Sequence, residues 1–226
     1  AIDRVRTDFQ GSGSHNWKWY QVKEAFMDPR THLYVLYSLL MNIPNGGVTS
    51  FGSIIIKSFG FENQRSLLLS MPSGAVDSTF KLIVPVVADY MNERSIPTIF
   101  SISFLMIGGI MMSTLDVHNK VSLLIGYYIL MGAGSSWGLV KSMIAANTVC
   151  STKKTVVNLL QIIAYAAGNW IGPQTFQSSE APDYPTGKKL VAIFYCCSLG
   201  VLILGRLVNM RENGCRDERQ EEGTTP

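Results

Sequence analysis

Residues 96–115 read IPTIFSISFLMIGGIMMSTL, twenty residues without a charged side chain. A hydrocarbon core about 30 Å thick takes about 20 helical residues to cross, so this stretch is long enough to span a bilayer. Its apolar residues do not alternate with polar ones, and lipid offers no partners to backbone N–H and C=O groups. Residues 96–115 therefore predict a transmembrane helix.

Five further stretches have the same length and apolar character. They are residues 33–59, 67–88, 121–148, 155–176 and 190–209. Together the six stretches predict an all-α membrane protein with a six-helix transmembrane bundle over residues 31–209. The functional question then moves to the polar residues inside the spans, because they are costly to place in lipid.

The two ends of the chain differ from the apolar middle. Residues 1–30 predict a cytoplasmic linker with a short interfacial helix, since the sequence WKWY at 17–20 mixes aromatic residues with lysine, as headgroup regions favour. Residues 210–226 are charged and poor in apolar residues, which predicts a disordered cytoplasmic tail.

Lysine and arginine positions predict the orientation. Six crossings place both ends and the loops after the second and fourth spans on one side, which carries twelve of the nineteen Lys and Arg residues against five on the other. Because positive loops stay inside, both termini are predicted to be cytoplasmic. The net charge of +3 follows from this asymmetry and needs no nucleic-acid partner. We expect an integral, multi-pass protein of the plasma membrane.

The first span contains two carboxamides beside helix-breaking residues. Asn42 and Asn45 share a helix face, and Pro44 with Gly46 and Gly47 predicts local unwinding. An unwound backbone with inward carboxamides would suit a small-solute site. A hydrogen-bonded patch between helices would explain the same residues, and both interpretations stay open.

The fifth span carries a polar stripe and a stripe of small residues. Asn158, Gln161, Tyr165 and Asn169 recur at three or four residues, which indicates a wet cavity or a protein partner. Ala164, Gly168 and Gly172 recur at four residues, which predicts close packing against another helix.

Three charged residues lie well inside the spans, away from the span ends where Lys57 and Arg206 are found. Asp77 and Lys81 are four residues apart and are expected to pair, either as a structural ion pair or for coupling. Lys141, one turn after Trp137, has no partner nearby in sequence. It predicts either an anchor for a substrate carboxylate or a side chain that extends to the membrane surface.

No enzyme is predicted. The three histidines, His15, His32 and His118, lie in loops or at a span edge, and no catalytic or nucleotide-binding motif occurs. The four cysteines lack metal-ligand spacing. We therefore expect no catalytic residue, no metal and no cofactor.

Five strings carry a resemblance to a known family. They are EAFMDPRT at 24–31, NIPNGGVTSFGSIIIKSFGF at 42–61, LLLSMPSGAV at 67–76, IAANTVCSTKK at 144–154 and GNWIGPQTFQSSEAPDYPTGKK at 168–189. In this combination the chain resembles the C-terminal half of fungal allantoate permease-like transporters, in the anion:cation symporter branch of the major facilitator superfamily. The resemblance covers residues 22–209.

The resemblance implies one half of the superfamily fold, helices seven to twelve of a twelve-helix carrier, with a missing N-terminal six-helix half as partner. It also implies secondary active, proton-coupled transport of a small organic anion, such as allantoate, ureidosuccinate or a vitamin carboxylate, by alternating access. The site would lie near the midplane between the halves. The residues expected to bind substrate are Asn42, Asn45, Trp137, Lys141, Gln161, Tyr165 and Asn169.

Two features depart from the family pattern. Asp89 and Arg94 lie where the superfamily often carries a gating motif, but the match is degenerate. The charged residues Asp77, Lys81 and Lys141 replace residues that are mostly neutral in the family, so they either tune the substrate or mark a drifting copy. The alternative function is a truncated, non-transporting half of such a carrier.

Overall fold

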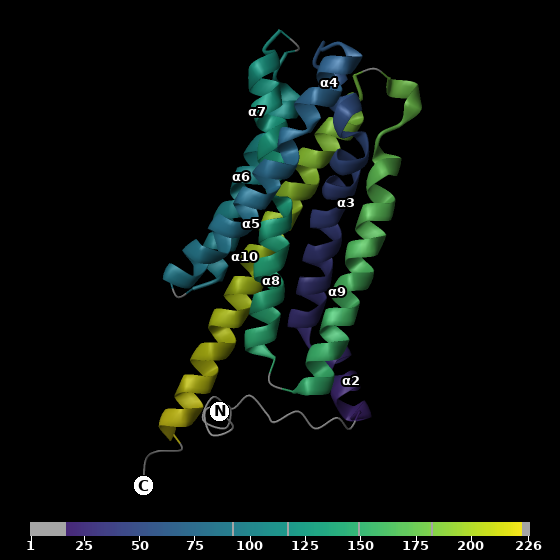
Figure 1. The fold of residues 1–226 in the computed structure, drawn as a ribbon. Coiled ribbons are helices and arrows are strands. Elements are labelled where there is room, and N and C mark those ends of the chain that lie inside the picture. Colours follow the sequence, from purple (N-terminus) through teal and green to yellow (C-terminus); the bar gives the residue numbers. More distant parts are fainter. Residues whose placement is uncertain (1–16, 92, 117, 149, 182, 223–226) are drawn as a thin grey trace.

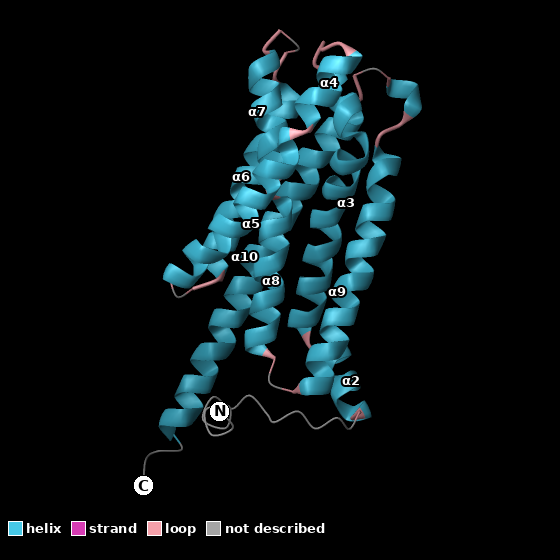
Figure 2. Cartoon of the chain, viewed as in Figure 1, coloured by secondary structure: helices cyan, strands magenta, loops and turns pink. Residues whose placement is uncertain are grey.

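The structure, a computed structural model, describes residues 17–222 except 92, 117, 149 and 182 (Figure 1). The described part is built from helices and short connections, without a strand (Figure 2). Residues 1–16 of the expected linker and residues 223–226 of the expected tail lie outside it.

The helices run lengthwise through the molecule as a bundle (Figure 1). Their bounds are α2 Trp19–Met27, α3 Pro29–Ser58, α4 Asn63–Ser70, α5 Pro72–Tyr90, α6 Ser95–Thr114, α7 Lys120–Leu130, α8 Ala133–Asn147, α9 Ser151–Ile171 and α10 Pro185–Glu222, with the 3₁₀ turns η1 Gly172–Thr175 and η2 Ser178–Glu180 between α9 and α10.

Five helical segments among the described residues are long and apolar enough to cross a membrane. They are Pro29–Ser58, Asn63–Tyr90, Ser95–Thr114, Lys120–Asn147 and Pro185–Arg211. Most of the remaining stretch, expected at 155–176, lies in α9, which is 21 residues long but is not among the five. Its lysines and its polar stripe make it less apolar, so a sixth span stays a prediction.

Two of the expected spans consist of two helices in succession. The second is interrupted at Met71, where Pro72 begins α5, because proline fits the first turn of a helix but not its interior. The fourth is interrupted between Leu130 and Ala133. Each pair still makes one continuous segment, Asn63–Tyr90 and Lys120–Asn147.

The expected unwinding at Pro44 is wrong. Helix α3 is continuous through Pro44, Gly46 and Gly47, beginning at Pro29 after the cap residue Asp28, whose carboxylate accepts a hydrogen bond from the Arg30 backbone. The glycines instead allow close approach of another helix. A Cβ atom on Gly46 would lie 2.6 Å from the Cα atom of Asn169.

Helices α3 and α9 form a close pair through the small residues of α9. A Cβ atom on Gly168 would lie 2.9 Å from the Asn42 Cβ atom and 2.9 Å from the Leu39 carbonyl oxygen. Gly172 has the same relation to the backbone of Ile43. The predicted packing stripe of the fifth span is therefore confirmed, and its partner is α3.

Helix α10 extends further than the last apolar stretch. It continues to Glu222, so the backbone of residues 210–222 is helical where we expected disorder. Extending an existing helix has no nucleation cost, and the sequence there is rich in Glu, Gln and Arg, which favour helices. The start of α2 and the end of α10 lie at the same end of the bundle (Figure 1).

Candidate substrate site on helices α3, α8 and α9

A carboxamide pair connects α3 and α9. The Asn45 Nδ2 atom donates to the Asn169 Oδ1 atom at 3.2 Å, and Asn169 Nδ2 donates to the Tyr165 carbonyl at 2.8 Å. Both asparagines are partly exposed. The pair joins the two polar stripes predicted from the sequence, and its open side has amide groups that can still bind another polar molecule.

An aromatic layer lies further along the same two helices. The Trp137 indole of α8 packs on the Tyr165 ring of α9 with 4.7 Å between ring centroids. Its Nε1 atom donates to the Ser38 hydroxyl at 2.9 Å, and that hydroxyl donates to the Gln161 carbonyl at 3.4 Å. This chain of contacts fixes the indole plane against α3 and α9.

Lys141 completes this layer from α8. Its Nζ atom lies 3.8 Å from the centroid of the Trp137 ring. The sequence places Trp137 one turn before Lys141, and the structure brings the charged end of the lysine to the ring. Among the described residues Lys141 forms no ion pair. The ring face is attractive to the ammonium, but it does not neutralise its charge.

We take the side of α9 that carries both layers as the candidate face. Tyr165 and Asn169 are one turn apart on α9, and both are at least partly exposed. Ser38 and Asn45, which contact the two layers from α3, are seven residues apart, or about 10 Å along a helix axis. The carboxamides therefore lie about 6–10 Å along the helix axes from the aromatic layer that holds the Lys141 ammonium.

Asn42 and Gln161 do not lie on this face. Asn42 is 2% exposed and its Nδ2 atom donates to the Ser38 carbonyl within α3 at 2.6 Å. Gln161 is fully buried, and neither polar atom of its side chain has a hydrogen-bond partner within the described part of the chain. Both residues lie behind the exposed layers, in the interface between helices.

Asp77 and Lys81 form the expected ion pair on α5, with 2.6 Å between Lys81 Nζ and Asp77 Oδ2. The pair lies against Gly134 of α8, where a Cβ atom would be 3.4 Å from the Asp77 carboxylate. Gly134, Gly138 and Lys141 recur at four and three residues, so they share a face of α8. The ion pair is thus next to the face that carries Lys141, two turns away.

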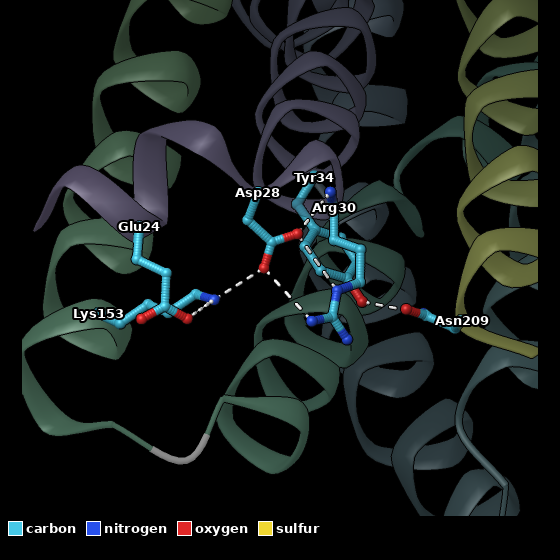
Figure 3. Close-up of polar contacts among 6 residues, drawn as sticks. All are labelled: Glu24, Asp28, Arg30, Tyr34, Lys153 and Asn209. Carbon is cyan, nitrogen blue, oxygen red and sulfur yellow. Dashed lines mark hydrogen bonds and ion pairs between the residues drawn. The ribbon is translucent and has the colours of Figure 1, made fainter. Parts of the chain in front are cut away.

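A second charged group, at the end of the bundle near α2, was not predicted (Figure 3). Lys153 of α9 contacts Glu24 of α2 at 2.8 Å and Asp28 at 2.9 Å, and Asp28 also contacts Arg30 at 3.3 Å. Next to it, Asn209 Nδ2 donates to the Tyr34 hydroxyl at 3.1 Å. These contacts fasten α2, α3, α9 and α10 together.

Proton affinities in this group follow from its contacts. Burial alone would raise the pKa of Asp28, but hydrogen bonds from Lys153 and Arg30 outweigh it and leave that pKa lowered. Burial would lower the pKa of Lys153, but its bonds to Glu24 and Asp28 leave that pKa raised. Both side chains are therefore held in their charged forms.

The connection between α5 and α6 makes two polar contacts. Arg94 donates to the Ser142 carbonyl of α8 at 3.0 Å, and Glu93 pairs with Arg206 of α10 at 3.1 Å. Asp89, Arg94 and Arg206 also line an open cavity of about 930 Å³ between α5, α8 and α10. The geometry ties the connection to the bundle but assigns it no gating motion.

Comparison with known proteins identifies relatives over the whole chain. Allantoate permease of Saccharomyces cerevisiae is 35% identical over 100% of this chain and 43% of its own length. An uncharacterized transporter of Schizosaccharomyces pombe is 31% identical over 98% of this chain and 44% of its own length. The MFS-type transporter cnsL of Penicillium expansum is 31% identical over 99% of this chain and 47% of its own length.

No protein-family model and no solved structure matches the chain. The relatives are transporters and not enzymes, and the chain spans less than half of their length, a share that fits one half of such a carrier. With its apolar helices, it is an integral multi-pass membrane protein. The chain is thus homologous, over its full length, to allantoate permease and other fungal MFS-type transporters.

Proposed function

We propose that the chain is the C-terminal six-helix half of a carrier that moves a small organic anion across the plasma membrane by alternating access, coupled to protons. The observation that carries the proposal is Lys141. It is a cation on a polar face inside a helix that is apolar enough to cross the membrane, held on an indole and without a carboxylate partner among the described residues.

The substrate's charged end would bind Lys141. In a low-dielectric environment a cation attracts a carboxylate much more strongly than in water, and its own burial disfavours the charge unless an anion compensates it. Trp137 and Tyr165 would provide the apolar surface beside this end. Lys141 therefore selects for anions.

The other end of the substrate would bind the carboxamides. Asn45 and Asn169 offer donors and acceptors that suit an amide or ureido group, about 6–10 Å along the helix axes from the aromatic layer that holds the cation. A molecule with a carboxylate at one end and a ureido group at the other fits this spacing, and the name of the yeast relative supports that class. Asn42 and Gln161 would position these helices from behind.

Proton coupling would involve Asp77. Its carboxylate is paired with Lys81 and partly exposed beside the α8 face that carries Lys141. Protonation of Asp77 would break the ion pair and release Lys81, which changes the charge next to the site. This gives the proton an effect on anion binding.

The alternative is that the chain is a truncated half that does not transport. A hybrid carrier distinguishes the transporting half from the non-transporting half. In the hybrid, this chain replaces the matching part of yeast allantoate permease. Uptake of labelled allantoate, ureidosuccinate and their neutral amides would be measured with and without a protonophore, beside cells that express the chain alone. Protonophore-sensitive uptake of the anions by the hybrid supports the proposal. A hybrid that reaches the plasma membrane and moves none of them, or moves the neutral amides equally well, contradicts it.

A further inference from the structure

Helix α2 lies at one end of the bundle (Figure 1), and it exposes a large amount of apolar surface. Trp19 is 76% exposed and Phe26 is 51% exposed, whereas Gln21 and Ala25 face the bundle and are buried. Single exposed apolar residues are common on proteins, but α2 exposes three aromatic side chains, with Tyr20 at 64%, and this indicates a contact. The described residues provide no cover for them.

The direction of this surface follows from the Lys153 ion pair. Glu24 contacts Lys153, which is in the first turn of α9, so the Glu24 side of α2 points toward the end of the bundle (Figure 3). Phe26 is two residues from Glu24 and Trp19 is five residues away, or about 200° and 140° around the helix. Trp19 and Phe26 therefore lie on the opposite side, toward the membrane.

The depth of α2 in the bilayer follows from its position in the sequence, directly before the first membrane-spanning helix. It ends at Met27, and after the single extended residue Asp28 the first membrane-spanning helix begins at Pro29. The helix therefore lies at the level where the bilayer begins. Aromatic side chains prefer this interfacial depth.

The charge of α2 indicates which lipids it meets. Lys18 and Lys23 are exposed, and neither forms an ion pair within the described part of the chain. Glu24 is already occupied by Lys153. The unpaired charge of the helix surface is thus positive, which complements lipid phosphates rather than another basic surface.

We propose that α2 is a lipid-binding helix that inserts Trp19 and Phe26 into the headgroup region while Lys18 and Lys23 bind the phosphates of anionic lipids. The Lys153 ion pairs hold the helix in the orientation that this contact needs. Lipid composition would then act on the α2–α9 contact, and so on the end of α9 that leads to Tyr165 and Asn169.

The test uses the full chain in vesicles. All native cysteines are replaced by serine, and a fluorescent label is attached at Phe26→Cys or, as the matched control at the same end of the bundle, at Ser151→Cys. Quenching by a lipid with a nitroxide in its headgroup region is compared with quenching by aqueous iodide. Vesicles contain phosphatidylcholine with or without phosphatidylglycerol.

The label at 26 should be quenched by the lipid and protected from iodide, unlike the label at 151, and phosphatidylglycerol should increase this difference. The Lys18→Gln/Lys23→Gln variant should lose the increase. At about 1 kcal/mol per lysine, the bound-to-free ratio of α2 in anionic vesicles should fall roughly 30-fold.

Three results would overturn the proposal. One is equal exposure of both labels to iodide, and another is a response that does not depend on phosphatidylglycerol or on the two lysines. The third is protection of position 26 from both quenchers, which would mean that protein, such as a second copy of the chain, covers α2. Circular dichroism of each variant confirms that the bundle is intact.

Discussion

At the scale of single residues, Lys141 combines a charge, an indole contact at 3.8 Å and the lack of an ion-pair partner among the described residues. Replacing Lys141 by Met keeps the length of the side chain and removes the charge. In the hybrid carrier the apparent KM for an anionic substrate should rise by tenfold or more, since a charged hydrogen bond contributes about 1.5–3 kcal/mol.

The control for this prediction is Lys57→Met. Lys57 is an exposed lysine near the end of α3, also without an ion pair in the described part of the chain. It should leave the KM unchanged, with both variants at equal surface abundance. If uptake kinetics of Lys141→Met match those of the parent, the lysine does not bind the anion and the site lies elsewhere.

Residue roles could be predicted from the sequence only where the helix period sufficed. Asp77 and Lys81 pair because four residues make one turn, and Trp137 contacts Lys141 for the same reason. Asn42 and Asn45 share a helix face, yet Asn42 is buried and Asn45 is partly exposed, because a helix period gives relative directions but not which side another helix covers. The packing of α9 decides that, and it encloses Asn42.

At the scale of elements, the α3–α9 contact depends on glycine. A Cβ atom on Gly168 would meet the Asn42 side chain and the Leu39 carbonyl, both at 2.9 Å, and backbone cannot move aside easily. Gly168→Ala should therefore destabilise the bundle by about 1–3 kcal/mol. Thermal unfolding in detergent, followed by a fluorescent size-exclusion assay, measures this.

Gly200→Ala is the matched control, since a Cβ atom there would meet nothing within 4 Å. Alanine favours helices over glycine by about 1 kcal/mol, so this variant should be neutral or slightly more stable. Equal melting temperatures for the two variants would show that α3 and α9 tolerate separation.

The docking of α2 on α9 should depend on pH, because Asp28 and Lys153 are held in their charged forms. The pKa of Asp28 is lowered below 3.8, so its contribution to stability is complete above that value and is lost as pH falls through the folded pKa. The pKa of Lys153 is raised above 10.5, so its contribution is complete below that value and is lost as pH rises through the folded pKa. Docking should be unchanged between these limits.

Removing the ion pairs should release α2 at neutral pH. Lys153→Met leaves Asp28 with Arg30 only, and hydrogen bonds to charged groups contribute about 1.5–3 kcal/mol. Amide hydrogen exchange in α2 should then be at least tenfold faster, whereas Lys189→Met, an exposed lysine far along the chain, should not change it. Unchanged exchange in Lys153→Met would mean that apolar contacts alone hold α2.

The positions of the helices could be predicted from hydropathy. The interruptions within helices and the contacts between helices were harder to predict. Pro72 starts a helix as expected of proline, while Pro44 was wrongly expected to break one. The pairing of Glu24 with Lys153 joins residues 129 positions apart, and no local pattern could reveal it. The extension of α10 to Glu222 was also missed, because the charged composition suggested disorder. Composition does not show that extending an existing helix has no nucleation cost.

At the scale of the whole molecule, the connections between helices lie at the two ends of the bundle. We predict that these two ends lie on opposite sides of the membrane. The α8–α9 connection lies at the end of the bundle that also holds α2, and the α9–α10 connection lies at the other end (Figure 1). The first end carries more Lys and Arg in the sequence, so we predict that it is cytoplasmic. This placement also requires α9 to cross the membrane, which its hydropathy alone does not establish.

One cysteine on each connection tests both points in intact cells. In a cysteine-free chain, Ser178→Cys lies between α9 and α10 and Ser151→Cys lies at the start of α9, and both positions are exposed. A membrane-impermeant maleimide should label position 178 from outside and should reach position 151 only after the cells are permeabilised. Labelling of both from outside would mean that α9 does not span the membrane, and the reverse pattern would mean that the positive-inside rule gives the wrong orientation for this chain. Either result would also move α2 and its lysines away from the anionic cytoplasmic leaflet, so the topology experiment constrains the lipid contact as well as the transport path.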